Sequence, residues 1–260
     1  MLIIPEMKNT LSNFFNPIQQ TKYIGSENYR KVAYYLEALQ ALSKLYDLSF
    51  YIVDYYKKSF YYVSPNPLFL AGYSQEEVLN LGFDFYPLCV PPDDLELLYV
   101  LNEAGFDFFY KLPVARRDKA MISYDFRLKH KDNGSLIMIN HKLSPLALTD
   151  EGNIWMAICL VTLSARIEPG DVHIIMRDDN TRYNLNPEEK KFEPAKYKKL
   201  TGREKEILKC IATGNNTYSI AGKLGIAEST VKNHKTNIFQ KLNVNSSAEA
   251  VFFAINHSLI

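Results

Sequence analysis

Cysteine and long apolar runs are scarce in this sequence of 260 residues, which excludes several kinds of site. The three cysteines, Cys89, Cys159 and Cys210, are far apart, so no C-x-x-C pair offers a metal or redox site. No run of 18 apolar residues exists, so no membrane-spanning helix is expected. The first residues carry no basic leader followed by an apolar run of secretory length. We therefore expect a cytoplasmic protein with reduced cysteines, no metal site and no membrane partner.

Groups with the spacing of a catalytic site are lacking as well. Catalysis needs an activated nucleophile or a paired acid and base, and neither the cysteines nor the five histidines have supporting neighbours. Asp93 and Asp94 suit the start of a helix instead. The sequence therefore predicts no catalytic residue and no evident cofactor, and a metabolic enzyme is the least favoured function.

Acidic residues are few in the C-terminal quarter of the chain. From residue 196 onward ten basic residues stand against four acids, a net charge of +6. Because the whole chain carries +1, the first 195 residues carry −5. Such an asymmetry favours a nucleic-acid-binding end, although a cluster of charges can also be a solvated helix face.

Aromatic residues, by contrast, are abundant, with 18 tyrosines and 15 phenylalanines, which favours a packed aromatic core or a cavity. Residues 27–46 have helical periodicity and could cap a domain or pair with a second copy of themselves. Two runs rich in β-formers should be strands, residues 49–55 and 59–64. Two further helices are expected, one that a capping box opens at Ser74 and one over residues 91–105 that ends at Gly105.

A β-hairpin over residues 122–143 is the clearest element of this part. Its turn at Asn133-Gly134 suits type I′, and a two-residue loop would pair Phe126 with His141 on the core side. Phe126 and His141 therefore form the candidate ligand pocket, although a hydrogen-bonded core histidine is the more common role for His141. Residues 153–163 should be a central strand, and residues 166–195 one more strand and a charged linker.

Four short helices are expected in the basic C-terminal quarter. A capping box of Thr201 and Glu204 opens the first, and Gly225 allows a tight turn between the second and the third. The third helix carries an apolar stripe of Val231, Ile238 and Leu242.

This quarter resembles the LuxR-type helix-turn-helix DNA-binding domain. The resemblance rests on Leu200, Thr201, Arg203, Glu204, Glu206, Ile207, Leu208, Gly214, Ile220, Ala221, Leu224, Ile226, Thr230, Val231, Lys232, His234, Ile238, Lys241 and Leu242. Three residues depart from the family's pattern, Gly202 in place of Pro, Ala227 in place of the Ser that opens the recognition helix, and Ser247 in place of a basic residue. An alanine cap costs about 0.5–2 kcal/mol, and we expect Glu228 or Ser229 to compensate.

The resemblance and helix geometry together assign contacts with double-stranded DNA, because the recognition helix presents its N-terminal residues to the major groove. The expected base contacts are Ser229, Lys232, Asn233 and Thr236. The expected phosphate contacts are Asn216, Thr217, Tyr218, Lys223, Lys235 and Lys241. The last helix has two apolar stripes, and we expect Ala250, Phe253 and Ala254 to be the exposed one that holds a homodimer.

Residues 46–165 resemble a PAS sensor domain. The resemblance rests on strand order and on three segments, "NPLFLAGYSQEEVL", "VPPDD" and the hairpin with the strand that follows it. It implies a small ligand or cofactor inside the sheet, or contacts with a partner protein. The cysteine motif of flavin-binding members is missing, and no acid cluster of a phospho-acceptor receiver is present.

The whole sequence predicts an α+β protein, with a PAS-like antiparallel sheet with helices followed by an all-α four-helix helix-turn-helix domain. The expected divisions are an N-terminal helical segment (1–45), a PAS-like sensor domain (46–165), a strand and charged linker (166–195) and a LuxR-type domain (196–260). This organisation predicts a sequence-specific DNA-binding transcription regulator whose PAS-like domain senses a signal or mediates dimerisation. The alternative is a regulator whose N-terminal domain is a ligand-free protein-interaction scaffold.

Overall fold

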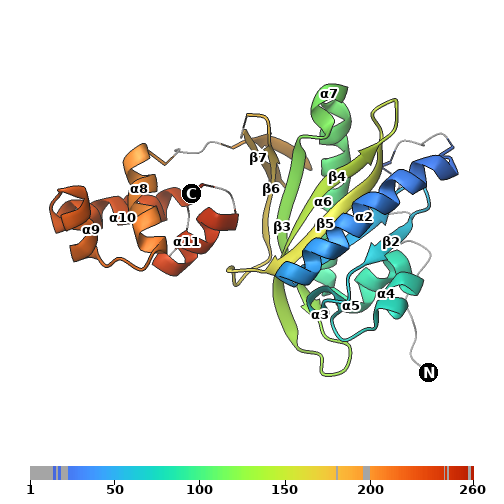
Figure 1. Ribbon diagram of the computed structural model, residues 1–260, viewed down its shortest axis with the longest axis horizontal. Helices are drawn as coiled ribbons and strands as arrows, with labels where there is room; N and C mark the ends of the chain where they lie inside the picture. The colour runs from blue at the N-terminus through green and yellow to red at the C-terminus, as the bar shows by residue number, and fades with distance from the viewer. Residues whose placement is uncertain are drawn as a thin grey trace. The chain divides into compact units, whose positions relative to one another are not determined.

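The computed structural model describes residues 14–15, 17–18, 23–179, 181–195, 200–242, 244, 246–256 and 259–260. The chain divides into two compact units, Met1–Ala195 and Lys196–Ile260 (Figure 1). Each unit has a hydrophobic core of its own. Of the expected organisation, residues 1–13, 16 and 19–22 of segment 1–45, residue 180, and residues 196–199, 243, 245 and 257–258 lie outside the described residues.

One antiparallel sheet organises the first unit. Its strands are β1 (Ser49–Asp54), β2 (Ser59–Val63), β3 (Ala120–Lys129), β4 (Leu136–Leu148), β5 (Ile154–Leu163), β6 (Gly170–Met176), β7 (Arg182–Asn186) and β8 (Lys191–Pro194). Within the described residues their order is β2-β1-β5-β4-β3-β6-β7-β8. Along the chain, two short strands precede a group of helices and three longer strands follow it, as the PAS resemblance predicts. The predicted α+β class is confirmed.

Helices cover both faces of this sheet (Figure 1). One face carries α2 (Ser26–Tyr46), whose Val32 shares a core cluster with Ile52 and Met156. The other face and the sheet edge carry α3 (Pro67–Leu70), α4 (Gln75–Leu81), η2 (Gly82–Asp84), α5 (Phe85–Cys89), α6 (Pro92–Lys111) and α7 (Val114–Arg117). The predicted capping box of Ser74 and Glu77 is present at the start of α4.

Helix α6 is longer than the sequence pattern predicted. It passes through Gly105, where we expected its end, and stops only at Lys111. Phe106 and Phe109 continue the buried face of Leu98 and Leu101. Packing of these additional turns therefore outweighs the cost of about 1 kcal/mol for a glycine inside a helix.

The register of the β3–β4 hairpin differs from the predicted one by two residues. Phe126 pairs with Ile139, and His141 pairs with Tyr124. The loop spans residues 130–135, and within it the Lys131 N–H donates to the Ala71 carbonyl at 2.8 Å. Since a shift of two residues keeps each side chain on its own face, Phe126 and His141 still point into the core.

Residues 166–195 are not a single strand and a linker, so that prediction is wrong. Strands β6, β7 and β8 extend the sheet beyond β3 as an antiparallel meander. Tyr183 and Phe192 make edge-on ring contacts with Phe108 of α6. The many charged residues of this segment made it resemble a linker, whereas its few apolar side chains attach it to the core.

The second unit is a bundle of α8 (Gly202–Ala212), α9 (Thr217–Leu224), α10 (Glu228–Leu242) and α11 (Ser247–Asn256). Its core contains Ile207, Leu208, Ile220, Val231 and Ile238. Gly225 ends α9 with φ 63°, a left-handed conformation that favours glycine, and this turns the chain into α10. In the part of the chain that the structure describes, no helix is both long and apolar enough to cross a membrane.

Candidate DNA-binding surface and sensor core

Two adjacent helices, α9 and α10, form the helix-turn-helix. The Asn216 side chain caps α9 by accepting the Ser219 N–H at 2.9 Å. Helix α10 starts after Ala227, whose carbonyl accepts the N–H groups of Thr230 and Val231. We expected Glu228 or Ser229 to supply the missing cap. Among the described residues, however, neither side chain hydrogen-bonds to the first turn of α10.

One face of α10 presents all four predicted base contacts to solvent. Ser229, Lys232, Asn233 and Thr236 are exposed and follow helical spacing, opposite the buried Val231 and Ile238. The Thr236 hydroxyl donates to the Lys232 carbonyl at 3.2 Å. The buried apolar stripe thus packs α10 against the rest of the bundle, and the polar face of the helix is left exposed to solvent.

Most of the predicted phosphate contacts are accessible too. Asn216, Tyr218 and Lys223 are exposed, and Thr217 and Lys235 are half-buried. None of the described residues forms an ion pair with Lys223, Lys232 or Lys235. Their ammonium groups are therefore available to an external anion.

Lys241 differs from these lysines because its ammonium is already paired within the domain. The prediction that Lys241 contacts a phosphate is therefore wrong. Its ammonium lies 2.6 and 2.8 Å from the two carboxylate oxygens of Glu204, which is buried. Glu204 also completes the predicted capping box with Thr201. Although burial by itself raises the pKa of the Glu204 carboxyl, hydrogen bonds from Lys241 and Thr201 hold that pKa below its usual value. Lys241 thus joins α10 to α8.

Arg203 has a role that the sequence did not reveal. Its Nη2 donates to the Leu224 carbonyl at 2.7 Å, and its Nη1 lies 2.8 Å from the Glu206 carboxylate. The guanidinium therefore ties α8 to the last turn of α9, immediately before the Gly225 turn. The family resemblance included Arg203, but only the fold brings it to Leu224.

The stripe of α11 that we expected to be exposed is in the core. Ala250, Phe253 and Ala254 pack into the bundle, so their prediction as the dimerisation surface is wrong. The opposite stripe is exposed instead, at Ala248, Phe252 and Ile255. Both stripes are apolar, and the sequence offered no signal to choose between them.

In the first unit, the predicted pocket residues Phe126 and His141 are both fully buried. His141 Nε2 lies 2.6 Å from the Tyr51 hydroxyl, which in turn lies 2.5 Å from the Tyr86 hydroxyl. Burial lowers the pKa of His141 to about 3, so the ring is neutral near pH 7. The structure therefore gives His141 the role of a hydrogen-bonded core residue.

Neither Phe126 nor His141 lines either of two neighbouring cavities in the described part of this unit. A cavity of about 90 Å³ lies between α6 and the inner face of the sheet, and a smaller one of about 30 Å³ adjoins it. The two cavities share five lining residues, Tyr55, Leu101, Asn102, Tyr124 and Leu143. Roughly 10–15 Å³ accommodates one water, so the larger cavity has room for several waters or a small molecule.

The wall of the larger cavity is largely apolar. Its polar side chains among the described residues are Tyr55, Asn102 and Tyr124, and no charged side chain lines it. Burial raises the pKa of Tyr55 and of Tyr124 well above the usual value, so both phenols are neutral hydrogen-bonding groups. The many aromatic residues suggested a cavity, but its walls come from several elements that only the fold brings together.

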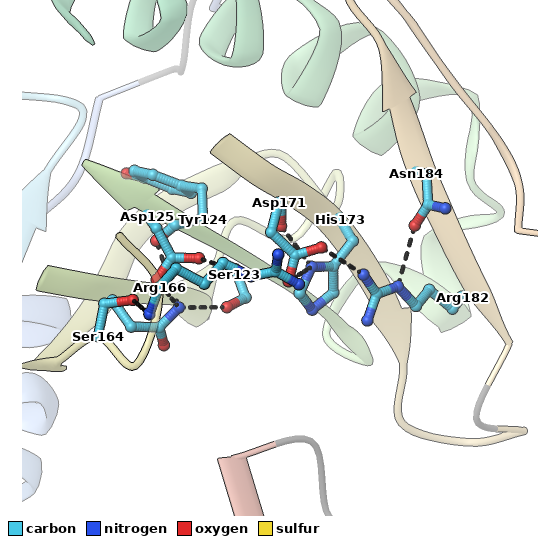
Figure 2. A network of polar contacts seen from close by, with 10 residues as sticks. Ser123, Tyr124, Asp125, Ser164, Arg166, Asp171, His173, Arg182 and Asn184 are labelled. Carbon is cyan, nitrogen blue, oxygen red and sulfur yellow. Dashed lines mark hydrogen bonds and ion pairs between the residues drawn. The ribbon is translucent and has the colours of Figure 1, made fainter. Parts of the chain in front are cut away.

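A polar cluster occupies the outer face of β3 and β6, on the side of the sheet away from this cavity (Figure 2). Arg166 lies 3.1 Å from Asp171 and 3.9 Å from Asp125, and Arg182 donates to Asp171 at 2.8 Å. His173 Nδ1 lies 2.6 Å from the Asp171 carbonyl. We call these five residues the crossover cluster, because Arg166 belongs to the segment that crosses from β5 to β6.

Burial changes the protonation of the crossover cluster. It raises the pKa of Asp125 to about 6, against opposing hydrogen bonds from Ser164 and Asn140. It also lowers the pKa of His173 well below the usual value, so this ring is neutral near pH 7. Near neutral pH two carboxylates thus face two arginines, and the cluster fixes the crossover and β7 to the sheet.

Comparison with known proteins bears on the second unit. The family model described as bacterial regulatory proteins, luxR family, matches residues 198–254. These residues form a LuxR-type helix-turn-helix domain. The matched range includes the whole of α8, α9 and α10, and most of α11.

Curated relatives are similar to part of this chain. The uncharacterized transcriptional regulatory protein YhcZ of Bacillus subtilis is 43% identical over 67 residues, which cover 26% of this chain and 31% of that protein. The transcriptional regulatory protein DegU of Brevibacillus brevis is 34% identical over 103 residues, 37% of this chain and 44% of that protein. The chain therefore spans less than half the length of these relatives.

Several solved structures align with more of the chain. The VqmA dimer of Vibrio cholerae, described as a LuxR-type receptor, is 16% identical with a TM-score of 0.35. The alignment covers 85% of this chain and 87% of that one.

Proposed function

We propose that this chain is a DNA-binding transcription regulator that acts as a homodimer in the cytoplasm, where its DNA target is. The observation that carries the proposal is the exposed face of α10, where Ser229, Lys232, Asn233 and Thr236 lie together in a LuxR-type domain. A helix of this kind fits the major groove, whose base edges offer distinct patterns of donors and acceptors.

The individual side chains suit different parts of the duplex. Lys232 suits the O6 and N7 acceptors of guanine, and Asn233 suits the paired donor and acceptor of adenine. The ammonium groups of Lys223 and Lys235 suit phosphates, as do Asn216, Thr217 and Tyr218 at the start of α9. The +6 charge of residues 196–260 supports the same assignment.

Two copies would occupy two half-sites. The exposed apolar stripe of Ala248, Phe252 and Ile255 on α11 is our candidate for the contact between DNA-bound domains. Phe252→Glu should weaken cooperative binding to a double site while leaving single-site affinity within about two-fold. Its neighbour Phe253 is buried, so a polar residue there should unfold the domain instead.

For the first unit, we propose a sensor whose ligand occupies the cavity beside α6. Because uncharged side chains line this cavity, the ligand should be a small neutral molecule with apolar surface and one or two polar groups for Tyr55, Asn102 or Tyr124. Native mass spectrometry of the protein as purified should show a bound small molecule that denaturation releases. A protein that carries none, even when offered cell extract, would favour the ligand-free interaction scaffold.

Selection of bound sequences from a random DNA pool, with the full chain, tests the DNA-binding proposal. We expect an enriched sequence with two related half-sites. Affinity for that sequence should fall by roughly 10³-fold or more between 50 and 200 mM salt if six or more phosphates are contacted. The absence of enrichment, or an affinity that salt does not change, would overturn the proposal and favour another class of protein.

A further inference from the structure

Helix α2 carries apolar side chains on two opposite sides. Toward the sheet, Val32 is buried and Leu36 and Leu39 pack against the same cluster. The opposite side presents Tyr34, Ala38, Ala41 and Leu45 to solvent, and Tyr34 and Leu45 are 70% and 78% exposed. A surface helix normally carries charged residues on this side, so the outward stripe points to a partner.

The outward stripe has the spacing of a coiled-coil seam. Tyr34, Ala38, Ala41 and Leu45 follow one another at intervals of four, three and four residues. Tyr35 and Leu42 flank this seam on one side, and Glu37 and Lys44 flank it on the other. Toward the N-terminus the seam ends at Lys31, which occupies its next position.

We propose that this seam pairs α2 with the α2 of a second copy of this chain, antiparallel about a two-fold axis. In that arrangement Tyr34 packs on the partner's Leu45, and Ala38 packs on the partner's Ala41. Two alanines at the centre allow the helix axes to approach closely. The same surface serves both copies, as a two-fold interface requires.

The charges on the flank select the antiparallel arrangement. Glu37 faces the partner's Lys44 and Lys44 faces the partner's Glu37, so two opposite-charge pairs form. A parallel pair would instead place Lys31 against the partner's Lys31 at the end of the seam. In the antiparallel pair Lys31 lies beyond the overlap, where it meets no like charge.

The proposed pairing is independent of DNA binding and of the α11 stripe. About three helical turns from each copy form a small interface, so we expect a dissociation constant in the roughly micromolar range. Sedimentation of the full chain without DNA should therefore show a concentration-dependent dimer. A wild-type chain that stays monomeric well above this range would overturn the proposal.

Ala41→Glu tests the seam, because it places a carboxylate at the apolar centre of the pair. The dissociation constant of the dimer should rise about ten-fold or more. Lys31→Glu is the matched control, since it alters an exposed charge on the same helix outside the overlap and should leave the dimer unchanged. Ala41 and Lys31 are exposed, so both variants should keep the wild-type thermal transition. If Ala41→Glu lowers that transition, Leu45→Ser at the end of the seam replaces it.

A charge swap tests the orientation. Glu37→Lys alone should weaken the dimer, and Glu37→Lys together with Lys44→Glu should restore it. A double variant that stays as weak as the single one would overturn the antiparallel pairing. A dimer that survives Ala41→Glu but dissociates with Phe252→Glu would overturn the α2 interface, while DNA binding by the LuxR-type domain would still stand.

Discussion

The ammonium of Lys241 lies 2.6 Å from the carboxylate of Glu204, and this ion pair joins the last turn of the recognition helix to the first turn of α8. The side chain of Lys241 is only 17% exposed and that of Glu204 only 3%. The recognition helix is thus held at one end by this pair and along its length by Val231 and Ile238. The side chains of its polar face, Ser229, Lys232, Asn233 and Thr236, are exposed to solvent.

The first prediction concerns the stability that this pair provides. Lys241→Gln leaves the buried Glu204 carboxylate without its cation, so the LuxR-type domain should lose roughly 2–3 kcal/mol of unfolding free energy, less than for a fully buried pair. Hydrogen exchange of amides in α8 and α10 should become correspondingly faster. Unchanged exchange would mean that the ion pair does not hold these helices together.

The second prediction separates structural from phosphate-binding lysines. Lys235→Gln should reduce the slope of log affinity against log salt by about 1, because one phosphate contact is lost. Lys241→Gln, at a temperature where the domain is folded, should leave this slope unchanged. Equal slopes for the two variants, measured on the selected DNA site, would contradict the assignment of Lys235.

The third prediction concerns base recognition. Asn233→Ala should cost about 1–3 kcal/mol of binding free energy and relax specificity at one base pair of each half-site. Lys223→Ala should instead weaken binding to all sequences alike, because a phosphate contact carries no sequence information. Competition with single-base variants of the selected site distinguishes these outcomes. A uniform loss for Asn233→Ala would remove it from the base contacts.

Local patterns in the sequence predicted much of this structure. The capping boxes at Ser74 and Thr201 are present because their hydrogen bonds join residues three apart, whatever the rest of the chain does. The exposed face of α10 could be predicted because helical spacing alone puts Ser229 and Thr236 opposite Val231.

The errors arise where a distant residue decides the outcome. Lys241 and Glu204 are 37 residues apart, so no local pattern indicated that this lysine pairs with a carboxylate. In the hairpin loop, the Lys131 N–H donates to the carbonyl of Ala71, a distant residue that no local pattern brings to this loop. For α11 the sequence offered two apolar stripes, and only packing buries the one that contains Phe253.

The fourth prediction concerns the pH dependence of stability. The pKa of Asp125 is about 6 in the folded chain, above the usual value of 3.8. The folded state therefore binds this proton more tightly than the unfolded state. Protonated Asp125 thus contributes to the free energy of unfolding. This contribution is present in full below about pH 4 and is lost as the pH rises through 6. A shift of about two units corresponds to roughly 3 kcal/mol.

Asp125→Asn tests this linkage, because an amide stays neutral at every pH and can still contact Asn140. The first unit of this variant should be more stable than wild type above pH 6, by up to roughly 3 kcal/mol, and the difference should shrink toward pH 4. Thermal denaturation at pH 5, 6 and 7, followed by the fluorescence of Trp155, measures the difference. A variant that is less stable than wild type at pH 7 would show that the Arg166 contact outweighs the cost of burial.

The last prediction concerns Gly105, which lies inside α6 and lines the larger cavity. A Cβ atom at this position would meet Ile122 Cδ1 at 3.6 Å, an ordinary contact distance. Gly105→Ala should therefore stabilise the first unit by about 0.5–1 kcal/mol and reduce the space available to a ligand. Native mass spectrometry should then show a smaller fraction of ligand-bound protein.

Gly222→Ala is the matched control, because Gly222 lies inside α9 and a Cβ atom there would meet nothing within 4 Å. It should stabilise the LuxR-type domain by a similar amount and leave ligand occupancy unchanged. If Gly105→Ala stabilises the first unit but binds as much ligand as wild type, the ligand does not use the α6 side of the cavity. The smaller cavity, which Tyr55 and Tyr124 also line, would then be the candidate ligand site.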